Sequence, residues 1–314
     1  MPRSSDMTSR ALPIRSTPAA RSLTILAAGL ITLVVFSPVL KSAVSLGMHD
    51  DRYLQILVAP LACCLLLFWE RTEIFSRAAY SPQAGIPLLA VSALLGIFSL
   101  YANLAGGGAG GPLAVSAMIL MWMAAFALCC GMDSFRAALY PLCCLFLMIP
   151  VPSSWMDRAT VFLQNGSAGF SYGILRMVGM PVWRHGTTFS LPGLDFEVAR
   201  ECSGIHSSLA LMMIAILAGY ICLRSGWTRV ALITLTVPIA LLKNAIRIVV
   251  TTVLAVRVDR AFIDGPFHHR YGGVVFSAVG VVPFVLLLAG LQRVERVALR
   301  TRKMTHLKTR PNLG

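Results

Sequence analysis

Long apolar stretches separated by short polar connections dominate the chain. A helix needs about 20 apolar residues to cross a hydrocarbon core of about 30 Å. The pattern predicts spans at residues 22–40, 53–69, 86–104, 112–131, 136–151, 205–223, 228–257 and 272–292. We therefore expect an all-α protein, a polytopic membrane helical bundle with about eight transmembrane helices.

The composition excludes an ordinary soluble domain, because 57% of the residues are hydrophobic and only 13% are charged. The formal net charge of +14 would suit a nucleic-acid partner. The basic residues, however, lie at the edges of the predicted spans, and the sequence has no basic domain large enough to bind nucleic acid. We expect membrane lipids around the protein and no nucleic acid.

The Lys and Arg residues outside the spans lie mostly on the side that also holds both chain ends. The positive-inside rule then predicts that both termini are cytoplasmic, an N-in and C-in topology. We expect basic cytoplasmic tails at 1–21 and 293–314, with a transmembrane domain at 22–292 between them. The segment 297–314 is expected to be disordered. No clear cleavage site follows the first apolar segment, so we expect a retained helix and not a signal peptide.

The longest connection, at 152–204, lies on the periplasmic side in this topology. Its part "ATVFLQNGSAGFSYGILRMVG" has apolar residues at helical spacing, which predicts a helix lying along the membrane interface. The following "GTTFSLPGLDFEVARE" alternates, which predicts a short extended or hairpin segment.

One cysteine, Cys202, stands in a polar setting at the outer end of the sixth predicted span. It lies in "ARECSGIHSS", between Glu201 and Ser203, whereas six of the eight cysteines form adjacent pairs inside apolar segments. A helix N-terminus lowers the pKa of a thiol, so a reactive thiolate is one interpretation. A small buried residue is the other. A disulfide is not expected, because no second cysteine faces outward.

Two cations, Lys243 and Arg247, lie inside the seventh predicted span, next to Asn244. Charges inside a span are costly and usually functional. Either they form a buried structural pair or contact lipid headgroups, or one of the cations binds a carbonyl oxygen or stabilises an oxyanion.

Two adjacent histidines, His268 and His269, precede the eighth predicted span on the same outer side. Adjacent residues cannot easily share one ion and no ligand spacing accompanies them, so we expect no metal site. A cysteine with a positioned histidine is a workable pair for acyl transfer.

Three motifs together resemble the exosortase/archaeosortase family of membrane transpeptidases. They are "RHGTTFSLPGLDFEVARECSGIHSS", "LKNAIRIVV" and "FHHRYGGVVF". The segment "YPLCCLFLMIPVPSSWMD" is also similar to the part of that family before its large outer loop. The resemblance covers about 130–290, which is then the catalytic part of the domain.

The resemblance implies a catalytic set of Cys202 as nucleophile, Arg247 as oxyanion or thiolate stabiliser and His268 as general acid and base. His268 is preferred because the family's histidine commonly stands four residues before a glycine, here Gly272; His269 is the alternative. Where the family often has arginine after "CSGI", this chain has His206, one helical turn from the thiol. Supporting roles are expected for Glu201, Ser203, Gly204, His206 and Asn244.

The implied function is a cysteine transpeptidase of the inner membrane, which forms a thioacyl-enzyme intermediate. Its implied substrates are exported proteins that end in a Pro-Glu-Pro-type motif, an apolar helix and a basic tail. No metal or organic cofactor is implied. The alternatives are a transporter or flippase whose Lys243 and Arg247 bind an anion, and a membrane acyltransferase. The absence of an internal repeat argues against the transporter.

Overall fold

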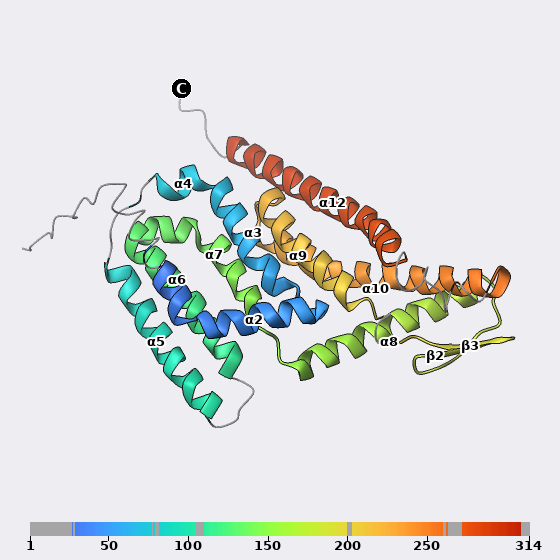
Figure 1. The fold of residues 1–314 in the computed structure, drawn as a ribbon. Helices are drawn as coiled ribbons and strands as arrows, with labels where there is room; N and C mark the ends of the chain where they lie inside the picture. The colour runs from blue at the N-terminus through green and yellow to red at the C-terminus, as the bar shows by residue number, and fades with distance from the viewer. Residues whose placement is uncertain are drawn as a thin grey trace, which may run out of the picture. The chain divides into compact units, whose positions relative to one another are not determined.

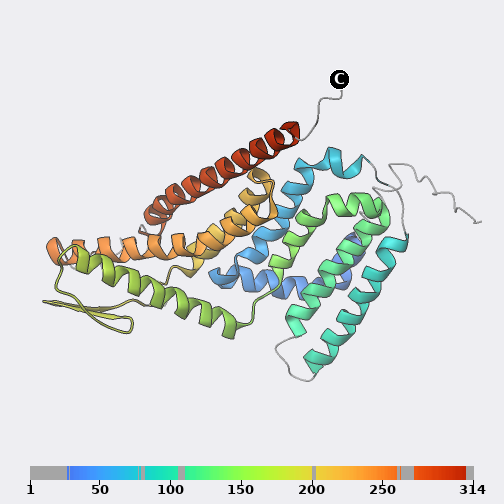
Figure 2. The ribbon, with the colours of Figure 1, turned by 180° about the vertical axis from the view of Figure 1, so that it is seen from behind.

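The computed structural model describes residues 27, 29–76, 78, 82–104, 110–199, 203–259, 262 and 272–308. Most of these residues are helical, and the chain divides into two compact units, Met1–Pro152 and Ser153–Gly314 (Figures 1 and 2). The helical membrane architecture expected from the apolar stretches is therefore present.

The first unit consists of helices. Its elements are a helix at Gly29–Val35, α2 (Ser37–His49), the 3₁₀ helix η1 (Asp51–Tyr53), α3 (Gln55–Trp69), α4 (Arg71–Phe75), α5 (Pro82–Leu104), α6 (Gly110–Ala137), α7 (Leu139–Cys143) and the 3₁₀ helix η2 (Cys144–Met148).

Helices α5 and α6 lie side by side as an antiparallel pair, as both ribbon views show. Serine hydroxyls of α5 bond to carbonyls of α6: Ser92 Oγ donates to Ala117 O at 2.8 Å, and Ser99 Oγ donates to Gly110 O at 2.7 Å. Small hydroxyl-bearing residues let membrane helices approach closely and bond across the interface. These bonds give the hairpin its register.

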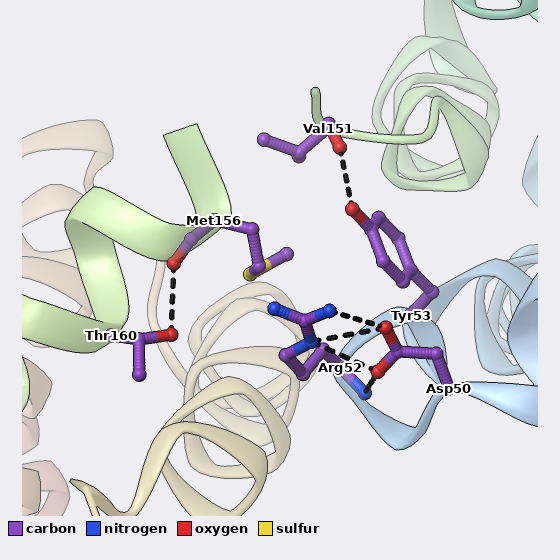
Figure 3. A network of polar contacts seen from close by, with 6 residues as sticks. All are labelled: Asp50, Arg52, Tyr53, Val151, Met156 and Thr160. Atoms are coloured by element: carbon purple, nitrogen blue, oxygen red, sulfur yellow. Dashed lines mark hydrogen bonds and ion pairs between the residues drawn. The ribbon is translucent and has the colours of Figure 1, made fainter. Parts of the chain in front are cut away.

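The connection between α2 and α3 is held by polar contacts, shown in Figure 3. The carboxylate of Asp50 accepts from the backbone N–H of Arg52 at 2.9 Å and pairs with its guanidinium at 2.7 Å. The Tyr53 hydroxyl donates to Val151 O at 3.0 Å, which ties the last residues of the first unit to η1, just before α3.

The second unit contains the three motifs that carry the resemblance. Its elements are α8 (Ser153–Met177), β1 (Trp183–His185), β2 (Thr188–Leu191), β3 (Leu194–Glu197), α9 (Ile205–Cys222), α10 (Gly226–Arg257) and α12 (Gly272–Lys308). Helix α10 is the centre of this unit, because α8, α9 and α12 all pack against it.

Helix α8 confirms the helix predicted in the long connection between spans. Its buried residues follow one face at helical spacing: Met156, Thr160, Leu163, Gln164, Ser167, Ala168, Ser171 and Leu175. Ser171 Oγ donates to Ala245 O of α10 at 3.4 Å. The start of α8 also carries a local bond from Thr160 Oγ1 to Met156 O at 2.9 Å (Figure 3).

The extended segment predicted after this helix forms β2 and β3 of a three-stranded antiparallel sheet in the order β1-β2-β3, and β1 precedes the predicted segment. The fold is therefore not all-α, as the apolar pattern alone suggested, but mostly helical with a small sheet. Phe189 of β2 is fully buried and stacks on Phe196 of β3 at 5.2 Å between ring centroids. Phe189 belongs to a core cluster with Leu175 of α8 and Ile248 of α10, so the sheet covers this end of the helices.

A buried carboxylate, Glu295 of α12, holds the turn between α9 and α10. It accepts from the backbone N–H of Arg224 at 3.0 Å, from the backbone N–H of Ser225 at 2.8 Å and from the Thr228 hydroxyl. Ser225 is the N-cap residue of α10 and its side chain makes no capping bond. Glu295 therefore supplies, from another helix, the negative group that a helix N-terminus favours.

Replacing Glu295 with alanine is expected to lower the free energy of unfolding by about 2–4 kcal/mol. Hydrogen bonds to a charged group contribute about 1.5–3 kcal/mol each, and the N–H groups of Arg224 and Ser225 would lose their acceptor. The measurement is equilibrium unfolding in detergent. Arg293→Ala, an exposed change two residues away on the same helix, should stay within about 0.5 kcal/mol. Equal losses for both variants would show that the hydrogen bonds of Glu295 do not stabilise the turn between α9 and α10.

Six of the described helices are long and apolar enough to cross a membrane, and the number rises to 8 if each of two broken helix pairs is one span. The six lie at Asp51–Trp69, Gly85–Leu104, Gly110–Ala137, Ile205–Cys222, Gly226–Arg257 and Ala278–Thr301. Each overlaps one of the spans predicted from the sequence.

The two remaining predicted spans, 22–40 and 136–151, are not single helices in their described parts. The first is bent by 78° between the helix at Gly29–Val35 and α2, where Pro38 stands in the first turn of the new helix. The second is divided among the end of α6, α7 and η2. Pro141 has no N–H to offer the carbonyl of Ala137, where α6 ends.

The expectation of disorder at 297–314 is wrong as far as Lys308, because α12 continues to that residue. From Arg293 to Lys308 the chain has no glycine or proline and is rich in arginine, lysine and leucine, all good helix formers. Residues 309–314 lie outside the described residues.

Candidate active site

The described residues include only part of the predicted catalytic set. Cys202 and Glu201, together with His268 and His269, lie outside them. Arg247 and the supporting residues Ser203, Gly204, His206 and Asn244 lie within them. The described part of the site therefore consists of Ser203 and Gly204 of the "CSG" motif and of "KNAIR", residues 243–247.

The glycine of the first motif is held against the asparagine of the second. Gly204 is the N-cap residue of α9 and has a left-handed backbone, φ 76° and ψ 15°. A Cβ atom there would lie 3.0 Å from Cγ and 3.1 Å from Oδ1 of Asn244. Only glycine combines this backbone with so close an approach. The turn that follows Cys202 in the sequence therefore packs directly on α10.

The first turn of α9 bonds back to the same glycine. Gly204 O accepts from Ser207 Oγ at 3.1 Å and from Ser208 Oγ at 2.8 Å, besides the helical N–H of Ser208 at 2.9 Å. Ser203 is buried, and its hydroxyl accepts from the N–H of Ile205 at 3.4 Å. The helix starts at Ile205, as predicted, so its N-terminus closely follows Cys202 in the sequence.

Lys243 lies in the interior of the second unit, with only 5% of its surface exposed. Its Nζ atom donates to Ser207 Oγ of α9. A Cβ atom on Gly280 of α12 would lie 2.6 Å from its Cδ atom. The Lys243 side chain is therefore enclosed by α9 and α12, and neither Ser207 nor Gly280 was singled out from the sequence.

Arg247 lies four residues further along α10, about one helical turn or 6 Å from Lys243. It is half-buried, with its Nε atom shielded from solvent. The next two residues, Ile248 and Val249, belong to the core that α10 shares with α8 and the sheet. Arg247 is thus held on a rigid part of α10, which suits a group that must keep a fixed orientation.

His206 is the second residue of α9 and is exposed. The contact between His206 and the Cys202 thiol that the sequence suggested falls on a residue outside the described ones. It stays a prediction.

The segment that leads to Cys202 is also anchored. Gln164 of α8 is buried, and its Nε2 atom donates to Val198 O at 2.5 Å. Val198 itself is buried in the core beneath the sheet. The chain is therefore held before residues 200–202 by α8 and after them by α10.

An apolar groove of about 190 Å³ begins beside this turn. It is lined by α8, α9 and α10, with Phe162, Ile205 and Met212 among its side chains. Ile205 directly follows Gly204, so the groove leads away from the proposed position of the nucleophile. Such a groove can hold an apolar side chain or chain segment.

No group of three or more His, Cys, Asp or Glu side chains that could hold a metal ion occurs within the described ranges of the chain. Lys243 of α10 brings a positive charge to the first turn of α9, where it bonds to Ser207. The described part of the site thus offers cations, hydroxyls and an amide.

Comparison with known families matches residues 45–285 to a family described as transmembrane exosortase. The match extends over most of the chain, including much of the first unit, for which the sequence motifs offered little support. No curated protein and no solved structure matches the chain.

Proposed function

Because the chain belongs to the transmembrane exosortase family, we propose that it cleaves the C-terminal sorting signals of exported proteins and transfers the new carboxyl end to an acceptor. Membership of this family indicates a multi-pass membrane transpeptidase. The proposal goes further in naming the signal, which consists of a Pro-Glu-Pro-type motif, an apolar helix and a basic tail.

Cys202 is the proposed nucleophile. Its thiolate sulfur bonds to the peptide carbonyl carbon, and the carbonyl oxygen becomes an oxyanion, which Arg247 stabilises. When the C–N bond breaks, His268 or alternatively His269 donates a proton to the departing amine. The resulting thioester then passes its acyl group to an incoming nucleophile. Glu201 and Ser203 flank the thiol, and no cofactor takes part.

The observation that carries this proposal is the contact between Gly204 and Asn244. The two residues lie far apart in the sequence. Gly204 directly precedes α9, and Asn244 lies in the second half of α10. Their contact brings the turn next to Cys202 onto the helix that carries Arg247. A nucleophile and an oxyanion stabiliser must be neighbours in space, so this contact supports their joint role.

The proposed topology places this turn on the periplasmic face of the inner membrane, with both chain ends in the cytoplasm. The excess of Lys and Arg on the side of the chain ends supports it. The apolar groove beside Ile205 supports a substrate whose signal contains an apolar helix. A basic tail on that substrate would stay on the cytoplasmic side for the same electrostatic reason.

The proposal is tested by trapping the covalent intermediate. A tagged exported protein carrying the three-part signal is co-expressed with the enzyme, and the membranes are treated with hydroxylamine, which cleaves thioesters. We expect a substrate–enzyme adduct that hydroxylamine releases and that maps to Cys202. A membrane-impermeant maleimide added to the periplasmic side should compete for the same residue.

Other outcomes identify the alternatives. An adduct that carries a lipid acyl group instead of a peptide would indicate a membrane acyltransferase. Solute movement that depends on Lys243 and Arg247, with no adduct, would indicate a transporter. Labelling of Cys202 only after the membrane is opened would place the site on the other face.

A further inference from the structure

A buried ammonium group stands close to the proposed site and has no role in the chemistry described above. Lys243 is 5% exposed, although burying a charge inside a membrane span is costly unless it is hydrogen-bonded. We propose that Lys243 and Ser207 are a positioning pair, which holds the Gly204 turn on α10 and thereby orients Cys202 toward Arg247. The proposal rests on the proposed role of Cys202.

The pair closes a ring of contacts between α9 and α10. Lys243 Nζ donates to Ser207 Oγ, and Ser207 Oγ donates in turn to Gly204 O at 3.1 Å. Gly204 packs on Asn244, which is the residue next to Lys243. One turn of α9 and one turn of α10 are thus joined at two points, so the Gly204 turn cannot slide or rotate without breaking a contact.

Helix α12 closes the third side of the Lys243 side chain. A Cβ atom on Gly280 would lie 2.6 Å from Cδ and 3.0 Å from Cγ of Lys243. The absence of a side chain at Gly280 therefore gives the lysine the space in which it points toward α9. Lys243 lies on α10, which also carries Arg247. It contacts α9, which follows Cys202 in the sequence, and α12, which follows His268.

The chemistry of the pair favours positioning over anion binding. A bound anion would have to face the ammonium, yet that group lies in the interior and bonds to a hydroxyl. The Ser207 hydroxyl accepts a hydrogen bond from Lys243 of α10 and donates one to Gly204 O at the start of α9. The position of α10 therefore orients the Gly204 turn. A misplacement of about 1 Å at reacting groups can cost about 10²-fold in rate.

The experiment uses the full-length enzyme in membranes with Lys243→Met, Ser207→Ala and the double variant. We expect each single variant to lower kcat between about tenfold and 10²-fold with little change in KM. The double variant should be no worse than the poorer single one, because both changes break the same contact. Ser207→Thr, which keeps the hydroxyl, should retain most of the activity.

A second readout needs no substrate. The rate at which maleimide alkylates Cys202, followed by peptide mapping over a range of pH, should change to the same extent in both single variants and in the double variant. Protein abundance in the membrane and the unfolding midpoint are recorded for each variant. A purely structural role would lower abundance without altering the pH profile of alkylation in the protein that remains.

Two glycines of α12 provide a matched pair of variants. Gly280→Ala places a methyl group against Lys243 and should reproduce the Lys243→Met result. Gly290→Ala adds the same methyl group on the same helix, where no atom beyond the adjoining residues and backbone of α12 itself lies within 4 Å of the new Cβ, and should behave as wild type.

Additive losses, a loss seen only in KM, or equal effects of Gly280→Ala and Gly290→Ala would overturn the positioning pair. If the proposed function is wrong, a different result is expected, because the Cys202→Ala variant would still process the substrate. The alkylation series still decides the positioning proposal in that case, since it measures the Cys202 thiol directly.

Discussion

Replacing Cys202 with alanine or serine is expected to reduce processing of a co-expressed substrate below detection. Loss of the nucleophile in a covalent hydrolase typically costs about 10⁶ in kcat, and a serine hydroxyl in this position lacks the low pKa that makes a thiolate reactive. The measurement is a gel shift of the substrate, which loses its C-terminal helix and tail on cleavage.

The matched control is Cys222→Ala. Cys222 is a free, half-buried cysteine at the C-terminal end of α9, so its loss removes a thiol without touching the proposed site. It should process substrate at close to the wild-type rate. Residual processing by Cys202→Ala at normal abundance would remove Cys202 from the role of nucleophile.

Arg247→Lys is expected to lower the processing rate by about 10²–10³-fold although it keeps a positive charge. Lysine offers a compact point charge in place of a planar fork, so it cannot reproduce a two-pronged contact to an oxyanion or thiolate. Arg257→Lys, at the exposed end of the same helix, is the control and should be close to wild type.

The same assay ranks the neighbouring residues. Lys243→Ala should be milder than Arg247→Lys, because a positioning residue acts through the turn it holds. His268→Ala should abolish processing, whereas His269→Ala and His206→Ala should leave some activity. If Arg247→Lys processes normally while Lys243→Ala is inactive, the oxyanion role lies elsewhere and a transporter becomes the better interpretation.

Local hydropathy patterns in the sequence correctly predicted most of the secondary structure. The helix predicted at 205–223 is α9 at Ile205–Cys222, and the alternating segment after α8 supplies β2 and β3 of the sheet. Both follow from hydropathy over a few consecutive residues. The predictions missed helix breaks that depend on one residue among apolar neighbours, as at Pro38 and Pro141. They were wrong where charge was taken for disorder, as in the last part of α12.

The amino-acid sequence by itself determined that this is a helical membrane protein, and three motifs placed it in its family. It also marked Gly204, Asn244 and Arg247 as residues of interest, because motifs are local and keep their spacing. Only the tertiary structure decided that Gly204 packs on Asn244 and that Lys243 reaches Ser207. These contacts depend on how helices rotate and cross, and apolar periodicity specifies which face is buried without specifying the helix that covers it.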